Sequence, residues 1–164
     1  MTDDEIFVAV RERVRAGRPC DGDWHLDHEP ATPEAVAAAE ALIGHPFPPL
    51  LRRLYLEVAD GGFGPSCGVN GVGENGHGCV GSMLGDYVDW RDTPADPGDP
   101  PWTPGVVILG DSGYAVWAVL DCRSPEGRLS FLDGREIFAA DLTLSGWLTR
   151  WLSGTLDPHA LVGS

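Results

Sequence analysis

Two runs of helix-spaced apolar residues, separated by a proline-rich segment, form the clearest pattern in the chain. Apolar positions recur every three or four residues over 33–43 and over 49–58, which predicts two amphipathic helices. Thr32 stands before the first run and Gly44 follows it, as at typical helix starts and ends. Prolines in 45–49 prevent the first helix from continuing, so a helical hairpin is expected. Its predicted buried positions are Val36, Ala39, Leu42, Ile43, Phe47, Leu50, Leu51, Leu54, Tyr55 and Val58.

Helical spacing also predicts helices over residues 2–16, 82–91 and 142–152. The last of these carries leucines and tryptophans at successive helical positions, which is more typical of a packed core than of a ligand site. A polar segment, 18–31, separates the first helix from the hairpin and contains a candidate short strand or anchored loop. The candidate helix caps are Thr2, Ser82 and either Thr143 or Ser145.

The second half of the chain carries short apolar or alternating segments bounded by turn residues, which is typical of strands. Tight turns connect antiparallel neighbours. Helices followed by a mainly antiparallel sheet and a closing helix predict one α+β domain over residues 1–164. The tail, 155–164, is expected to be ordered only loosely. The predicted strands are 106–109, 114–121, 128–132 and 136–139.

The net charge of the chain limits the classes of partner that it can bind. It has 25 acidic and 11 basic residues among 164, a formal net charge of −14. Phosphate binding needs clustered basic residues, so no nucleic-acid partner is expected. No apolar run approaches the roughly 20 residues of a membrane span, and the N-terminus lacks a signal-peptide pattern. We therefore expect no membrane partner and a cytoplasmic location, with a surface charge that either maintains solubility or steers a basic partner.

The cysteines and histidines give no strong chemical signal. No CxxC pair is present, and cytoplasmic cysteines are most simply free thiols. Cys20, His25 and His28 match no usual structural zinc spacing, so surface histidines are the simpler interpretation. We expect no metal and no cofactor.

The glycine-rich segment 64–81 lacks the lysine of a P-loop and follows a helix, which argues against phosphate binding. We expect a flexible loop or an irregular hairpin. A thiol hydrolase that uses Cys67 or Cys79 with His77 remains an alternative, since a thiolate needs a neighbouring base.

Four motifs together resemble the SUKH superfamily, over about residues 32–154. They are the helical hairpin with its Gly61-Gly62-Phe63-Gly64 exit, the segment 102–113, the segment 120–128, and the tryptophan-rich end at 147–154. The sequence differs from the family at Ser112-Gly113-Tyr114-Ala115, where Trp-Gly-Cys-Gly or a relative is frequent.

The resemblance implies a SUKH-like α+β fold and a protein that acts by binding rather than by catalysis. Bacterial members of the superfamily are immunity proteins that bind a toxin domain, often a nuclease or deaminase, and eukaryotic relatives are regulatory interaction proteins. A basic toxin cleft would suit the acidic surface of this chain. A ligand-sensing module between helices and sheet is a further alternative. The expected partner-binding residues are acids and an aromatic residue on exposed loops: Asp60, Glu74, Asp86, Asp89, Trp90 and Asp111.

Overall fold

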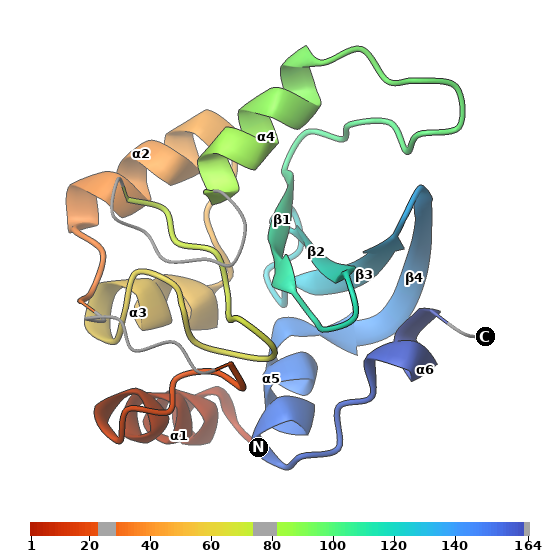
Figure 1. Cartoon of the computed structure of the whole chain (residues 1–164). Helices are drawn as coiled ribbons and strands as arrows, with labels where there is room; N and C mark the ends of the chain where they lie inside the picture. Colours follow the sequence, from red (N-terminus) through yellow and green to blue (C-terminus); the bar gives the residue numbers. More distant parts are fainter. Residues whose placement is uncertain (23–28, 74–81, 163–164) are drawn as a thin grey trace.

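The computed structural model describes residues 1–22, 29–73 and 82–162. Helices α2, α3 and α4 lie on one side of a four-stranded sheet, while α1 lies beside α5 and α3 (Figure 1). This arrangement confirms the α+β prediction. The helices are α1 (Asp3–Arg15), α2 (Pro33–Ile43), α3 (Pro49–Glu57), α4 (Met83–Asp92), α5 (Leu144–Leu152) and α6 (Pro158–Val162), and the strands are β1 (Val106–Asp111), β2 (Val116–Asp121), β3 (Arg128–Asp133) and β4 (Glu136–Thr143).

The predicted cap residues form the hydrogen bonds expected at the ends of the helices. The Thr2 hydroxyl accepts the backbone N–H of Glu5 at 3.3 Å, and the Glu5 carboxylate accepts the Thr2 N–H at 2.7 Å, so α1 begins with a capping box. Thr32 caps α2, and Gly44 ends it with a φ of 80°. Of the two candidate caps for α5, the structure uses Thr143.

The sheet is antiparallel throughout, in the order β1-β2-β3-β4, so each strand pairs with its neighbour in the chain. The register between β1 and β2 shifts between Ile108 and Gly110. A Cβ on Gly110 would lie 2.7 Å from the carbonyl oxygen of Gly68. Glycine is therefore required here, because it lets the segment 61–73 lie directly against β1.

The core joins the helical hairpin to the sheet and to α5. The Phe47 ring, 2% exposed, fills the elbow and lies 5.5 Å from the Tyr55 ring in an edge-on arrangement. Trp147 of α5 is fully buried in the same cluster. The predicted hairpin core is confirmed except at Leu42, which is 39% exposed. Leu42 lies about 100° round the helix from Ile43, at the edge of the buried stripe.

The segment 61–73 is packed against the sheet, so of the two alternatives expected for 64–81 the flexible loop is wrong for residues 64–73, and the bonds between Val69 and residues 62–63 agree with an irregular hairpin. The backbone N–H of Asn70 donates to the Leu109 carbonyl at 2.7 Å. The Tyr55 hydroxyl donates to the Asn70 carbonyl at 2.6 Å. Phe63 and Val69 are fully buried. Pairing with β1 satisfies the backbone here, which a sequence pattern cannot indicate. Residues 24–26, the candidate strand, and 74–81 lie outside the described ranges.

The tail, 155–164, was expected to be loosely ordered, but part of it is regular and packed. Residues 158–162 form α6, which packs against β3 and β4. The ring of His159 lies 4.4 Å from the ring of Tyr114, and Pro158 approaches Gly113. The tail is thus held against the β1–β2 turn. In the ranges described here, no helix is both long and apolar enough to cross a membrane.

Candidate partner-binding surface

Three of the predicted contact residues share helix α4. Asp86 and Asp89 are three residues apart, so their carboxylates lie on neighbouring positions of one helix face. Burial raises the pKa of Asp86, and the charge of Asp89 raises it further. Neither carboxylate forms an ion pair with a described basic residue. A cation placed against this face would relieve the repulsion between them.

Trp90 lies beside these acids but is partly committed to the fold. Its indole N–H donates to the carbonyl of Pro100 at 3.4 Å, which attaches the proline-rich loop 93–105 to α4. The side chain remains half-exposed. The face formed by Asp86, Asp89 and Trp90, here called the α4 face, therefore combines two unpaired charges with an anchored aromatic ring.

Asp60 does not match the expectation of an exposed acid. It is 8% exposed, and its carboxylate accepts the backbone N–H groups of Val72 at 2.7 Å and Gly73 at 2.9 Å. Two such bonds to an ionised group hold the end of the segment 61–73 in place. The side chain is therefore used internally. Glu74, another predicted contact, lies outside the described residues.

Asp111, the last predicted contact residue, lies at the end of β1 beside a small hollow. This hollow, here called the hairpin pocket, has a volume of about 280 Å³ and lies between the β1–β2 turn and the C-terminal helices. Its lining includes Asp21, Ser66, Ser112, Tyr114 and Trp151. It therefore brings together residues from four separate parts of the chain.

Ser66 connects Asp21, which lines the pocket, to Asp111, which lies next to the lining residues. Its hydroxyl donates to Asp111 Oδ2 at 3.2 Å, and its backbone N–H donates to Asp21 Oδ2 at 3.1 Å. Asp111 Oδ1 accepts the N–H of Gly113 at 2.7 Å, and Asp21 Oδ1 accepts the indole N–H of Trp151 at 3.0 Å. Both carboxylates are thus fixed in direction before any partner binds.

A larger groove of about 510 Å³ lies between the proline-rich elbow at 45–49, α3 and the β2–β3 turn. Its lining is apolar at Phe47 and Leu56 but also includes basic side chains. Three arginines line the groove, and each is paired with an acid of the chain: Arg52 with Glu40 at 3.2 Å, Arg53 with Asp4 at 2.6 Å and Arg123 with Asp121 at 2.8 Å. The groove therefore offers shape and apolar surface but little unpaired charge.

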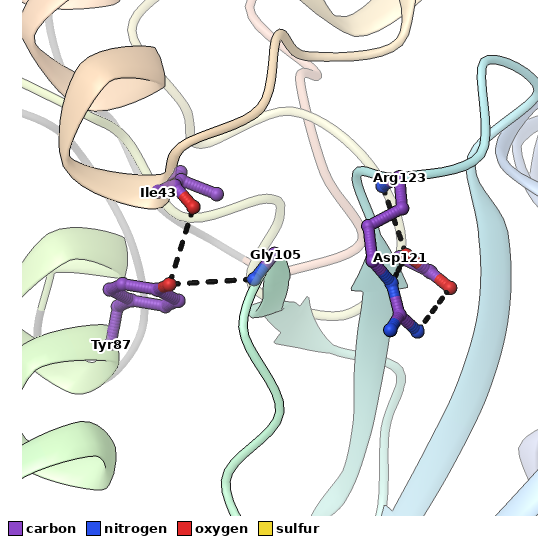
Figure 2. Close-up of polar contacts among 5 residues, drawn as sticks. All are labelled: Ile43, Tyr87, Gly105, Asp121 and Arg123. Carbon is purple, nitrogen blue, oxygen red and sulfur yellow. Dashed lines mark hydrogen bonds and ion pairs between the residues drawn. The ribbon is translucent and has the colours of Figure 1, made fainter.

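Figure 2 shows two groups of polar contacts, and of the residues drawn only Arg123 lines the groove. The Tyr87 hydroxyl lies 3.4 Å from both the Ile43 carbonyl and the Gly105 N–H, so it joins α4, α2 and the start of β1. Asp121 accepts two hydrogen bonds from the Arg123 guanidinium, each 2.8 Å long. These bonds lower the pKa of Asp121.

The thiols give no support to a cysteine nucleophile. Cys67 is disulfide-bonded, so the expectation of four free thiols is wrong at this position, and Cys67 cannot attack a substrate. Cys20 and Cys122 are free and buried, and burial raises the pKa of Cys122 to about 12. Cys79 and His77 lie outside the described residues.

The described residues give no support to a metal site. Among residues 1–22, 29–73 and 82–162, no cluster of three or more His, Cys, Asp or Glu side chains could hold a metal ion. His25 and His28 are not within these ranges.

Comparison with known families agrees with the motifs and with the fold. The model of the SMI1/KNR4 family, also called SUKH-1, matches residues 30–149. The chain belongs to the SMI1/KNR4 family. Members of this family are generally immunity or regulatory proteins without enzymatic activity. No curated protein and no solved structure matches this SMI1/KNR4 chain.

The hairpin pocket was not predicted from the sequence, although Asp111, whose carboxylate accepts hydrogen bonds from two of its lining residues, was a predicted contact. Asp111 was selected for its charge, and Ser112 and Tyr114 were noted only as a departure from the family's motif, not as residues of a pocket. The sequence offered one signal for this site: the β1–β2 turn lacks the asparagine and glycine that such a turn favours. Tyr114 and Ala115 have φ values of 56° and 61°, where asparagine and glycine are the usual residues.

Proposed function

We propose that this chain is an immunity-type protein that binds a basic toxin domain stoichiometrically and blocks it. A nuclease or deaminase domain fits best, because a cleft that binds nucleic acid is itself basic. Membership of the SMI1/KNR4 family carries the proposal, and the net charge of −14 supports it. Electrostatic attraction would speed the encounter of the two proteins and orient them.

The α4 face is the first contact surface that we propose. Asp86 and Asp89 repel each other in the free protein, so a partner arginine or lysine would gain from both carboxylates at once. Trp90 adds an aromatic surface of the kind that is enriched in interfaces. Asp60 has no place in this surface, because its carboxylate is buried against backbone N–H groups.

The test is a binding and protection assay with a C-terminal toxin domain encoded beside the gene. We expect a one-to-one complex, loss of toxicity when the two proteins are co-expressed, and an association rate that falls steeply as salt is raised. Asp89→Asn should slow association, whereas Glu126→Gln, which removes one exposed charge from the β2–β3 turn, should change it little. Association that does not depend on salt would remove the electrostatic part of the proposal, and absence of any complex would remove the pairing.

A regulatory or ligand-sensing module is the second candidate, favoured by the 510 Å³ groove beside the elbow. Its paired arginines make it a poor site for a basic toxin. Replacement of Leu56 in its apolar wall by arginine distinguishes the two candidates. The substitution should leave toxin neutralisation intact if the α4 face is the contact surface, and should abolish function if the groove is.

A further inference from the structure

The hairpin pocket contains a polar group that the chain itself does not satisfy. Ser112 is 2% exposed and lines the pocket, and its hydroxyl has no hydrogen-bond partner among the described residues. Leaving a buried hydroxyl unpaired costs about 1–3 kcal/mol. Ser112 lines the pocket but its Oγ has almost no exposed surface, so a bound group with N–H donors would satisfy this hydroxyl as an acceptor once the side chain turns towards the pocket.

Asp111 adjoins the same pocket with an unopposed negative charge. Its carboxylate accepts hydrogen bonds from Ser66 and Gly113, but it makes no ion pair with any basic residue that the structure describes. An ionised carboxylate can accept about four hydrogen bonds, so two positions remain free. The two internal bonds hold the carboxylate in place, so little entropy is lost when a cation binds.

Tyr114 provides an aromatic wall at the mouth of the pocket. Its side chain is 76% exposed, the largest exposure among the exposed large apolar residues described. The ring is nevertheless held, because it lies against the His159 ring, with the ring centres 4.4 Å apart and the ring planes tilted by 41°. A fixed, exposed aromatic ring beside a carboxylate is a favourable place for a planar cation.

The neighbouring wall of the pocket already shows the same chemistry with a residue of this chain. The Arg13 guanidinium lies 4.5 Å from the centre of the Trp151 ring and 3.9 Å from Asp21. Asp21 is thereby occupied, whereas no arginine of residues 1–22, 29–73 and 82–162 forms such a contact with Asp111 or Tyr114.

We propose that the hairpin pocket receives an arginine side chain of the basic protein partner. The inference rests on the proposed function for the identity of that partner. A guanidinium has five N–H donors in one plane, so it can bond to the Asp111 carboxylate and to the Ser112 hydroxyl while it lies against the Tyr114 ring. An ammonium group would satisfy the charge but would stack less well on the ring. An anion is disfavoured by both carboxylates.

The test uses the full chain and a small probe, so that it does not depend on the toxin. Acetyl-Gly-Arg-Gly amide is titrated into the labelled protein, and the Gly113 amide and Trp151 indole signals are followed by NMR. The matched control peptide carries citrulline, which has nearly the same shape without the charge. We expect weak, saturable shifts with the arginine peptide only. Equal responses to both peptides, or none to either, would overturn the proposal.

Three variants locate the binding. Asp111→Asn keeps an oxygen for the Gly113 N–H and removes the charge, so we expect it to weaken binding of the arginine peptide about tenfold. Tyr114→Gly removes the ring, while Ala115→Gly makes the same type of backbone change without touching the pocket lining. Binding that survives Asp111→Asn and Tyr114→Gly would place the peptide elsewhere. Failure of the toxin assay with intact peptide binding would reject the proposed function but not the pocket.

Discussion

The β1–β2 turn stores backbone strain that a single substitution should release. The Val116 N–H donates to the Gly113 carbonyl at 3.1 Å, and the two residues between them, Tyr114 and Ala115, both have φ near +60°. This is the geometry of a type I′ turn, which favours asparagine and glycine. Ala115 is exposed, so its methyl group contributes little to packing. We therefore predict that Ala115→Gly stabilises the protein.

The magnitude follows from two opposing terms. An L-residue in the left-handed region costs about 1–2 kcal/mol, which glycine does not pay. Glycine makes the unfolded chain more flexible, which removes about 0.4–1 kcal/mol of the gain. The net stabilisation should be about 0.5–1 kcal/mol. For a chain of this size, this corresponds to an increase in Tm of about 1–4 °C.

Thermal unfolding followed by circular dichroism measures the effect. The matched control is Ala37→Gly, the same substitution at an exposed position inside α2, where glycine should lower stability by about 0.5–1 kcal/mol. The two variants should therefore shift Tm in opposite directions. If Ala115→Gly lowers Tm as much as Ala37→Gly does, the turn is not strained and the reasoning is wrong.

Three further predictions concern buried and paired polar groups. Tyr55→Phe removes the donor to the Asn70 carbonyl, so chemical denaturation should show a loss of about 1–3 kcal/mol, and an unchanged midpoint would contradict this. Cys122 should resist a thiol reagent at pH 8 until the protein is unfolded, because burial raises its pKa to about 12; rapid modification of the native thiol would refute its burial. Arg123→Ala should cost less than about 1 kcal/mol at pH 7, because the pair is partly exposed. Since Arg123 lowers the pKa of Asp121, this difference should be present above the ordinary value of 3.8 and disappear as the pH falls through the lowered pKa; a difference that persists at pH 2 would exclude the ion pair as its source.

Local chemistry explains why the helices could be predicted from the sequence. The cap and the first turn of a helix lie within four residues of each other, as in Thr2 with Glu5 and in Thr32 with Pro33. The sequence therefore contains the complete signal for a helix start. Alternating apolar residues and turn residues likewise indicated the strands, although β4 extends to Thr143 beyond its predicted end. Strand ends depend on pairing with a neighbour, which the sequence of one strand does not contain.

Non-local pairing explains what could not be predicted. The segment 61–73 reads as a flexible loop because glycines dominate it, yet those glycines allow backbone to approach backbone. A Cβ on Gly68 would lie 2.5 Å from the carbonyl carbon of Gly62. Asp60 was expected on the surface for its charge, but the backbone N–H groups of this segment require a buried acceptor. Neither fact follows from hydrophobic periodicity.

Residues at the candidate surfaces break local rules that residues of the core follow. Residues such as Leu54 and Leu148 satisfy helical pattern, packing and burial together, which is what a foldable sequence requires. Tyr114 lies in a turn that favours asparagine, Ser112 buries an unpaired hydroxyl, and Asp86 lies beside a second carboxylate. Each of these raises the free energy of the isolated protein, and only Tyr114, whose ring contacts His159, has a described contact that acts in the opposite direction. A bound cation would offset two of them, at Asp86 and at Ser112, and would use the aromatic ring that the third displays. Departures from local rules are expected at functional sites. Their agreement on one kind of ligand, a basic side chain, is therefore the strongest structural argument that this acidic protein binds a basic partner.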